Sequence, residues 1–268
     1  MKFNQLWLMS RSIFGLTRIP VLDFVLPAHS LHSRMALLQK PLASCLLWLL
    51  AGAAVVALAW PLDNRIDTAL DASKNLPLHH FAWWCSKLGE GWAPAAAGIV
   101  FAMLFLLLNR PSVAAKIFFV GLTSDITGLT GFILRVLIGR TRPLAHAPQG
   151  FYGVWHDGHW IIGKYEFSSF PSGHAATAVG LAAAAWLVHR GWGALAAIYA
   201  LAVLWSRVAL QCHHLSDVVA SIVLAVPLAL MLKKFLLPSL EFQFGNLHRA
   251  WRGKAPRSAG LRPGKIQE

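Results

Sequence analysis

The stretch VAAKIFFVGLTSDITGLTGFILRVLI, residues 113–138, decides the fold that we expect for this chain. A helix needs about 20 mostly apolar residues to cross the hydrocarbon core of a bilayer. A helix also satisfies the backbone hydrogen bonds within its own segment, which matters because the bilayer core offers no water. The stretch is long and apolar enough, and it therefore predicts a transmembrane helix.

Further stretches have the same character, at residues 42–60, 92–109, 174–188, 193–212 and 217–236. The composition agrees, since 56% of the 268 residues are hydrophobic, 13% are charged and the mean hydropathy is +0.54. Such values are typical of membrane proteins. We therefore predict an all-α integral membrane bundle of six transmembrane helices.

The formal net charge of +13 is unevenly distributed along the chain. Six spans would place successive loops on alternate sides, and most of the 24 Lys and Arg then fall on the side that holds both termini. The positive-inside rule makes that side cytoplasmic. The basic residues near the C-terminus favour attraction to anionic lipid headgroups, and nucleic-acid binding is the weaker interpretation.

The composition predicts a single membrane domain at residues 41–238, whose first span is an uncleaved anchor. Residues 1–40 mix aromatic and basic positions and are expected to form a cytoplasmic, interfacial arm. In residues 239–268, Gly, Pro and Arg replace the apolar pattern, so we expect a basic, disordered cytoplasmic tail. The cysteines have no metal-ligand spacing and are interpreted as packed residues: Cys45, Cys85 and Cys212.

The outer loop, residues 140–170, is rich in aromatic residues suited to the headgroup level of a bilayer. In its middle, WHDGHW at residues 155–160 places Asp157-Gly158 between two similar flanks. This dipeptide is a strong signal for a two-residue hairpin turn. We expect the loop to form a small periplasmic lid.

Three polar clusters lie near the outer ends of the predicted spans. The first is RVLIGRTRP, residues 135–143, in which Arg135 and Arg142 share a helix face if the helix persists as far as Pro143. A guanidinium matches phosphate oxygens with two parallel hydrogen bonds and stays charged. The first cluster therefore favours an anion site.

The second cluster is PSGH, residues 171–174. Ser172 is a good N-cap for the following span, and Gly173 permits close approach to free backbone N–H groups, which bind anions at helix starts. His174 adds a side chain that exchanges protons near neutral pH.

The third cluster is SRVALQCHHLSD, residues 206–217. Asp217 follows His213 by four residues, so its carboxylate is expected to accept from one ring nitrogen and leave the other free to attack. Arg207 adds a third guanidinium to those of Arg135 and Arg142. Positive donors, a hydroxyl and two imidazoles match phosphoryl transfer, which relies on positioning and on preorganised positive charge.

These clusters resemble the signature of the type-2 phosphatidic acid phosphatase and vanadium haloperoxidase superfamily, which reads KxxxxxxRP, PSGH and SRxxxxxHxxxD. The resemblance covers about residues 60–236. It implies that His213 is the nucleophile that forms a phosphohistidine, that Asp217 orients it, and that His174 serves as acid and then as base. It implies that the phosphate is held by Arg135, Arg142, Ser172, Gly173 and Arg207, without a cofactor or metal. Arg135 stands where the family usually has Lys. This difference puts the fit of the substrate at this part of the phosphate site in question.

The sequence gives less reason to place the other polar residues in the site. Asp125 lies within a span and is favoured as an interhelical hydrogen-bonding residue over a catalytic one. His156 and His159 lack further metal-ligand partners and are expected to bond within the lid. His214 is out of register with the signature and is interpreted as a neighbour of the nucleophile.

We therefore expect a multi-pass phosphatase of a bacterial inner membrane, with cytoplasmic termini, whose periplasmic site removes phosphate from a lipid phosphomonoester or diphosphate. Its partners would be that lipid and the bilayer. A phosphotransferase with the same site remains an alternative. A haloperoxidase is disfavoured by the membrane spans, and a lipid transporter is disfavoured because the charges gather at one end, with Asp125 the exception.

Overall fold

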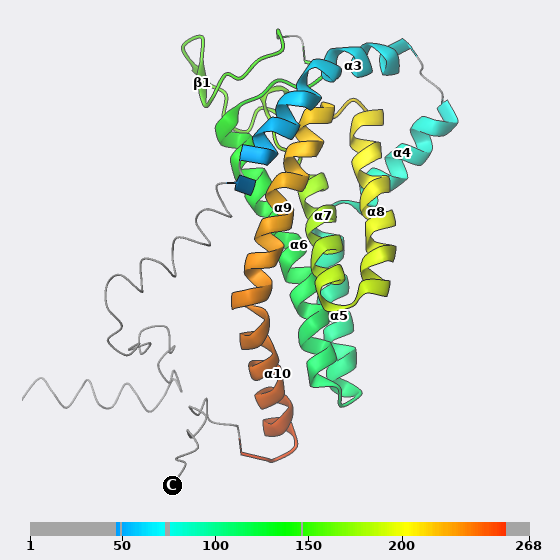
Figure 1. Cartoon of the computed structure of the whole chain (residues 1–268), viewed down its shortest axis with the longest axis vertical. Helices are drawn as coiled ribbons and strands as arrows, with labels where there is room; N and C mark the ends of the chain where they lie inside the picture. The colour runs from blue at the N-terminus through cyan, green and yellow to red at the C-terminus, as the bar shows by residue number, and fades with distance from the viewer. Residues whose placement is uncertain (1–46, 49, 73–75, 146, 256–268) are drawn as a thin grey trace, which may run out of the picture. The chain divides into compact units, whose positions relative to one another are not determined.

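The structure is a computed structural model that describes residues 47–48, 50–72, 76–145 and 147–255 (Figure 1). The chain divides into two units, residues 1–47 and 48–268, and the second is described below. The expected arm over residues 1–40 and the part of the tail beyond residue 255 lie outside the described residues.

The described chain is mostly helical, apart from the loop between α6 and α7. Residues 50–59 are helical and lead into a short 3-10 helix, η1 (Trp60–Leu62). The helices that follow are α3 (Asp63–Ala72), α4 (Leu76–Leu88), α5 (Trp92–Leu107), α6 (Pro111–Ile138), α7 (Gly173–Val188), α8 (Arg190–Ala209), α9 (Leu215–Phe235) and α10 (Leu237–Trp251).

Among the described residues, α6, α8 and α9 are long and apolar enough to cross a bilayer. Leu78–Leu88 of α4 and Trp92–Leu107 of α5 meet the same test together, as a pair bent by 51°. Helix α7 is apolar but has 16 residues. The predicted all-α membrane fold is therefore confirmed, whereas the count of six spans stays a prediction, since part of the first lies outside the described residues.

Small residues let α6 and α7 approach closely. Gly128 of α6 faces Thr177 of α7, and Gly180 of α7 faces Thr127 of α6, where a Cβ on Gly180 would lie 2.9 Å from the Thr127 Cβ. The Thr127 hydroxyl also donates to the Ala176 carbonyl at 2.9 Å. Interfaces of this kind are typical of membrane helices, because small side chains permit backbone contact. Helix α7 packs in addition against α8 and α9 (Figure 1).

Helix α6 begins with Pro111 at its first turn and ends at Ile138. Gly139 caps it with a φ of 65°, a left-handed conformation that glycine adopts without steric cost. The condition that the helix persists as far as Pro143 is therefore not met, whereas the predicted end of the span at residue 138 agrees with α6. Arg142 lies in the loop after α6 and does not share a helix face with Arg135.

The expectation of disorder from residue 239 was wrong for the first part of the tail. Helix α10 covers Leu237–Trp251 and continues beyond α9 (Figure 1). Its apolar face packs on the membrane helices, because Leu240 contacts the core around Phe119, and the Phe244 ring lies 5.5 Å from that of Phe118. The helical pattern was hidden by the polar residues on its other face.

The hairpin in the outer loop is confirmed. Strands β1 (Trp155–His156) and β2 (His159–Trp160) pair antiparallel. The turn residues Asp157 and Gly158 have φ values of 48° and 76°, as a two-residue turn with positive φ at both positions requires. Whether this hairpin acts as a lid stays a prediction.

Candidate active site

His213 lies in the turn between α8 and α9, where its ring is completely buried. Its Nδ1 is 2.7 Å from the carbonyl oxygen of Ser169. A carbonyl only accepts, so Nδ1 carries the hydrogen and Nε2 carries the lone pair. Among the described residues, this buried Nε2 has no hydrogen-bond partner. The ring is thus fixed on one side and free on the other.

The His213 imidazole is neutral at ordinary pH. Its pKa is lowered from 6.5 to about 3, mainly because burial removes the hydration of the charged form, and also because of the positive charges of Arg142 and Arg207. Asp217 partly opposes this effect. A neutral ring keeps the Nε2 lone pair available for attack.

Asp217, also completely buried, supports His213 mainly through Ser169. Its Oδ2 lies 3.7 Å from Nδ1 of His213, beyond hydrogen-bond distance. The same oxygen accepts from the Ser169 hydroxyl at 2.5 Å and from the His214 N–H at 2.9 Å. The direct bond expected from the sequence is therefore replaced by a relay in which the carboxylate holds Ser169, whose carbonyl holds the imidazole.

A buried ion network lies behind Asp217. Arg140 pairs with Asp217 through Nη1 and with Asp63 through Nη2, the latter at 2.8 Å, and all three side chains are completely buried. The Ser216 hydroxyl donates to Asp63 at 2.5 Å. The sequence analysis missed Arg140 and Asp63 because nothing in their spacing indicates a contact between α3 and the start of α9.

The start of α7 is built as the PSGH cluster predicts. Ser172 is the N-cap residue, and its Oγ accepts from the Ala175 N–H at 3.4 Å. A Cβ on Gly173 would lie 3.6 Å from Nη1 of Arg135, so this guanidinium reaches the first turn of α7. Arg135, Gly173 and His174 line one cavity of about 200 Å³.

Arg142 is held by the outer loop. Its guanidinium donates to the carbonyls of Tyr165, Ser168 and Cys212 at 2.7–2.9 Å, and it lies 3.8 Å from the centre of the Tyr165 ring. Three of its five N–H groups are thereby used, so two remain for an anion. The site is tied to residues 165–168 of the loop.

Arg207, at the end of α8, is held by a residue that the sequence analysis missed. Its Nη1 donates to the hydroxyl of Ser86 in α4, and its carbonyl accepts from the His213 N–H at 3.2 Å. No sequence pattern indicated Ser86 as a site residue, because α4 was not among the predicted spans. Arg207 is thereby held by α4 and by the turn between α8 and α9.

The two imidazoles lie near the same positive groups. His213 and His174 both lie within electrostatic range of Arg142 and Arg207, and His174 in addition of Arg135. Glu90, between α4 and α5, also acts on His174, and the sequence analysis did not single it out. The predicted site residues therefore gather at one end of the bundle.

The neighbouring candidates are placed differently. Both ring nitrogens of His214 have partners, Asp67 Oδ2 at 2.6 Å and the Thr141 carbonyl at 3.1 Å. Nε2 of His156 lies 3.1 Å from Asp157. In the described part of the chain, no group of three or more His, Cys, Asp or Glu side chains could hold a metal ion.

Within the described part of the chain, Asp125 does not make the interhelical hydrogen bonds expected of it. Its neighbours Ser124 and Thr127 make them, to the carbonyls of Thr177 and Ala176, each at 2.9 Å. Asp125 instead lines the cavity that holds Arg135 and His174. The expectation failed because the turn of the helix directs Ser124 and Thr127, but not Asp125, at α7.

The bundle brings arginine side chains, the N-terminus of α7 and two imidazoles to one end. Such an arrangement is suited to phosphoryl transfer in a membrane protein. Residues 114–239 match the model of the PAP2 superfamily. The resemblance that the motifs predicted is therefore confirmed over these residues.

A solved structure, that of a transmembrane PAP2-type phosphatidylglycerolphosphate phosphatase from Bacillus subtilis, is similar to this chain with a TM-score of 0.47 and 19% sequence identity. The similarity covers 73% of this chain and 95% of that one. Comparison with curated protein sequences found no match.

Proposed function

We propose that this chain is a membrane lipid phosphatase that hydrolyses a lipid phosphomonoester or diphosphate through a phosphohistidine on His213. The observation that carries the proposal is the state of the His213 ring, which is anchored at Nδ1 by Ser169 and unpartnered at the buried Nε2. The match of residues 114–239 to the PAP2 superfamily supports the assignment to phosphatases.

In the first step, the Nε2 lone pair of His213 attacks phosphorus and the bond from phosphorus to the lipid oxygen breaks. The departing oxygen takes a proton from His174, which the negative charge of the bound phosphate favours in its protonated form. Arg135, Arg142 and Arg207, with Ser172 and the Gly173 N–H, neutralise the oxygens of the transition state.

In the second step, water attacks the phosphorus of the phosphohistidine while His174 takes its proton. The bond between phosphorus and Nε2 breaks, inorganic phosphate leaves, and His213 returns to its neutral form. Asp217 and Ser169 keep the ring oriented through both steps, because Nδ1 keeps its hydrogen and donates it to the Ser169 carbonyl.

We propose that the site faces the periplasm of an inner membrane and that both termini are cytoplasmic. The support is the charge distribution, since most Lys and Arg would lie on the side opposite the site. The three apolar helices α6, α8 and α9 support a multi-pass membrane protein.

The test is phosphate release from a panel of lipids by the purified full chain, with phosphatidic acid, phosphatidylglycerophosphate and a polyprenyl diphosphate as substrates. The proposal predicts release from at least one lipid and loss of that release in His213→Asn. His159→Asn, in the exposed hairpin, is the matched control and should keep full activity. Unchanged release from His213→Asn would exclude this residue as the nucleophile, and labelled acceptor lipid in place of free phosphate would indicate a transferase.

A further inference from the structure

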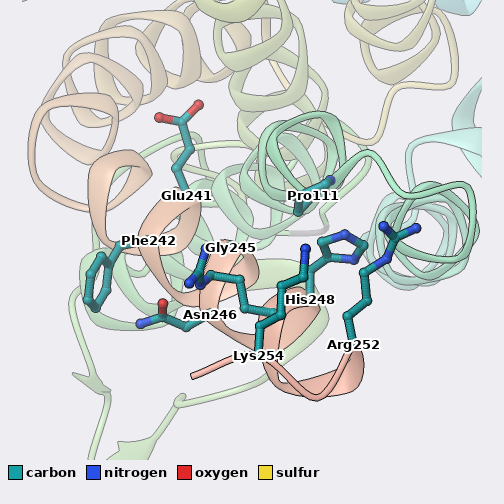
Figure 2. A pocket seen from close by; sticks show the side chains of 9 residues that line it. Pro111, Glu241, Phe242, Gly245, Asn246, His248, Arg252 and Lys254 are labelled. Atoms are coloured by element: carbon teal, nitrogen blue, oxygen red, sulfur yellow. The ribbon is translucent and has the colours of Figure 1, made fainter. Parts of the chain in front are cut away.

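A second pocket lies at the end of α10, far from the catalytic residues along the helix bundle. Its volume is about 320 Å³, and Figure 2 shows the side chains that line it. The lining residues are Pro111, Glu241, Phe242, Gly245, Asn246, His248, Arg249, Arg252 and Lys254. They come from α10, from the two residues around its end and from the first residue of α6.

The pocket is strongly basic. His248, Arg249, Arg252 and Lys254 line it, and among the described residues no carboxylate lies within ion-pair distance of the last three. Glu241 is the acidic lining residue, and it lies 3.9 Å from Lys116 and accepts from the Ser112 hydroxyl at 3.4 Å. Figure 2 shows Glu241 on the side of the pocket away from His248, Arg252 and Lys254. The net charge of the pocket therefore favours an anion.

Several of these donors are held in place. Arg252 donates to the side chain of Asn109 at 2.5 Å, and Nε of Arg249 donates to the Ala255 carbonyl at 2.9 Å. Each guanidinium keeps further N–H groups for a ligand. Nδ1 of His248 is buried and has no hydrogen-bond partner among the described residues. Fixed donors and an unsatisfied polar atom indicate an anion site that the protein itself does not fill.

Helix α10 also exposes apolar side chains, of which Phe242 lines the pocket. Phe242, Leu247 and Trp251 are 40%, 57% and 63% exposed. An amphipathic helix that presents aromatic and basic side chains together is typical of the interface between lipid headgroups and acyl chains. A soluble anion would need only the cations, whereas a lipid would use both kinds of side chain.

The pocket and the catalytic site lie at opposite ends of α6. Pro111 is the first residue of this 28-residue helix and Arg135 lies in its last turn. A rise of 1.5 Å per residue separates them by about 36 Å, which is close to the thickness of a bilayer. A ligand of the pocket therefore comes from the leaflet opposite to the one that the catalytic residues face.

We propose that this pocket, which we call the α10 pocket, binds the phosphate group of an anionic phospholipid in that opposite leaflet. Arg249 and Lys254 contact the phosphate oxygens, His248 donates or accepts through Nδ1, and Phe242 lies along the acyl chains. The bound lipid is not a substrate, because the residues of the phosphatase site are at the other end of the bundle. The proposal does not depend on phosphatase activity.

The test is native mass spectrometry of the purified full chain with phosphatidylglycerol or phosphatidylcholine, carried out in the His213→Asn background so that no lipid is consumed. The variant Arg249→Gln/Lys254→Gln is compared with the control Arg190→Gln/Lys234→Gln, which removes two exposed charges outside the pocket. We expect the pocket variant to lower the affinity for phosphatidylglycerol about tenfold or more, while the control changes it less than twofold. Melting temperatures within 2 degrees of each other, as roughly expected for surface charges, would exclude unfolding as the cause.

An equal loss in the control would contradict the proposal, because attraction would then follow overall charge. Equal retention of phosphatidylglycerol and phosphatidylcholine would also contradict it. Displacement of the lipid by millimolar inorganic phosphate would identify a soluble anion as the ligand and overturn the assignment to a lipid.

Discussion

Arg140 and Asp217 form an ion pair in which both side chains are completely inaccessible to solvent. Arg140 bonds at the same time to Asp63, and its guanidinium lies 4.0 Å from the centre of the Trp60 ring. Its carbonyl accepts from the Ser169 N–H at 3.0 Å. One residue thus holds both the carboxylate and the backbone segment that orient His213.

Replacement of Arg140 should be strongly destabilising. Arg140→Gln removes the cation between two buried carboxylates, and breaking a buried pair in this way costs about 3–5 kcal/mol. Arg65→Gln, on the exposed face of α3, is the matched control and should cost less than about 0.5 kcal/mol. Thermal unfolding in detergent, followed by circular dichroism, measures both. A small effect at Arg140 would mean that the network does not hold the site together.

Ser169→Ala should lower kcat with little change in KM. The variant removes the hydroxyl that donates to Asp217 but keeps the carbonyl that accepts from His213. Losing one hydrogen bond to a charged group corresponds to about 1.5–3 kcal/mol, or roughly a tenfold to hundredfold effect on kcat.

Ser168→Ala is the control for this change, since the Ser168 hydroxyl donates only locally, to the Lys164 carbonyl at 2.8 Å. Steady-state kinetics on the best lipid of the panel separates kcat from KM. Equal effects of the two variants would argue against the relay through Ser169.

The burial of His213 should make the fold sensitive to acid. Its pKa is about 3 in the folded state, against 6.5 as the ordinary value, so below pH 6.5 the unfolded chain binds a proton that the folded chain does not. Stability is therefore lost as the pH falls from 6.5 towards 3. At pH 5 the contribution of this residue is about 2 kcal/mol.

His213→Gln removes the titrating group, so the variant should lose less stability than the wild type between pH 7.5 and pH 5. Melting temperatures at the two pH values measure the difference. Parallel pH dependence in both proteins would mean that the ring is hydrated and charged at pH 5, in conflict with its burial.

Arg135 should tolerate Lys but not Gln. The guanidinium reaches the first turn of α7, and Lys keeps the charge there as a more compact ammonium. We expect Arg135→Lys to retain kcat/KM within about tenfold, and Arg135→Gln to lose about 10- to 100-fold, since it removes a charged hydrogen-bond donor. If Gln were as active as Lys, Arg135 would not contact the phosphate.

Local signals in the sequence predicted those parts of the fold that depend on neighbouring residues. Apolar length predicted α6, α8 and α9, the Asp157-Gly158 pair predicted the hairpin, and Ser172 was found as the N-cap of α7. These features follow from backbone geometry and hydropathy within a few residues. Gly139, by contrast, ends α6 before Pro143, so that Arg135 and Arg142 do not share a helix face.

The residues that hold the site residues in place could not be predicted from such local signals. Asp63 bonds to Ser216 across 153 positions, and Ser86 bonds to Arg207 across 121. Such contacts depend on how helices pack, which no spacing in a single sequence encodes. The motifs therefore predicted which residues gather, but not that Ser169 and Arg140 hold them.

The central claim is that Nε2 of His213 becomes phosphorylated, and trapping of the intermediate tests it most directly. The purified chain is mixed with a lipid labelled on phosphorus, quenched in alkali within the first turnover, and the label is mapped by mass spectrometry. We expect a base-stable, acid-labile label on His213 that is absent from His213→Asn. Label on His214, or full turnover by His213→Asn without any labelled protein, would contradict the account.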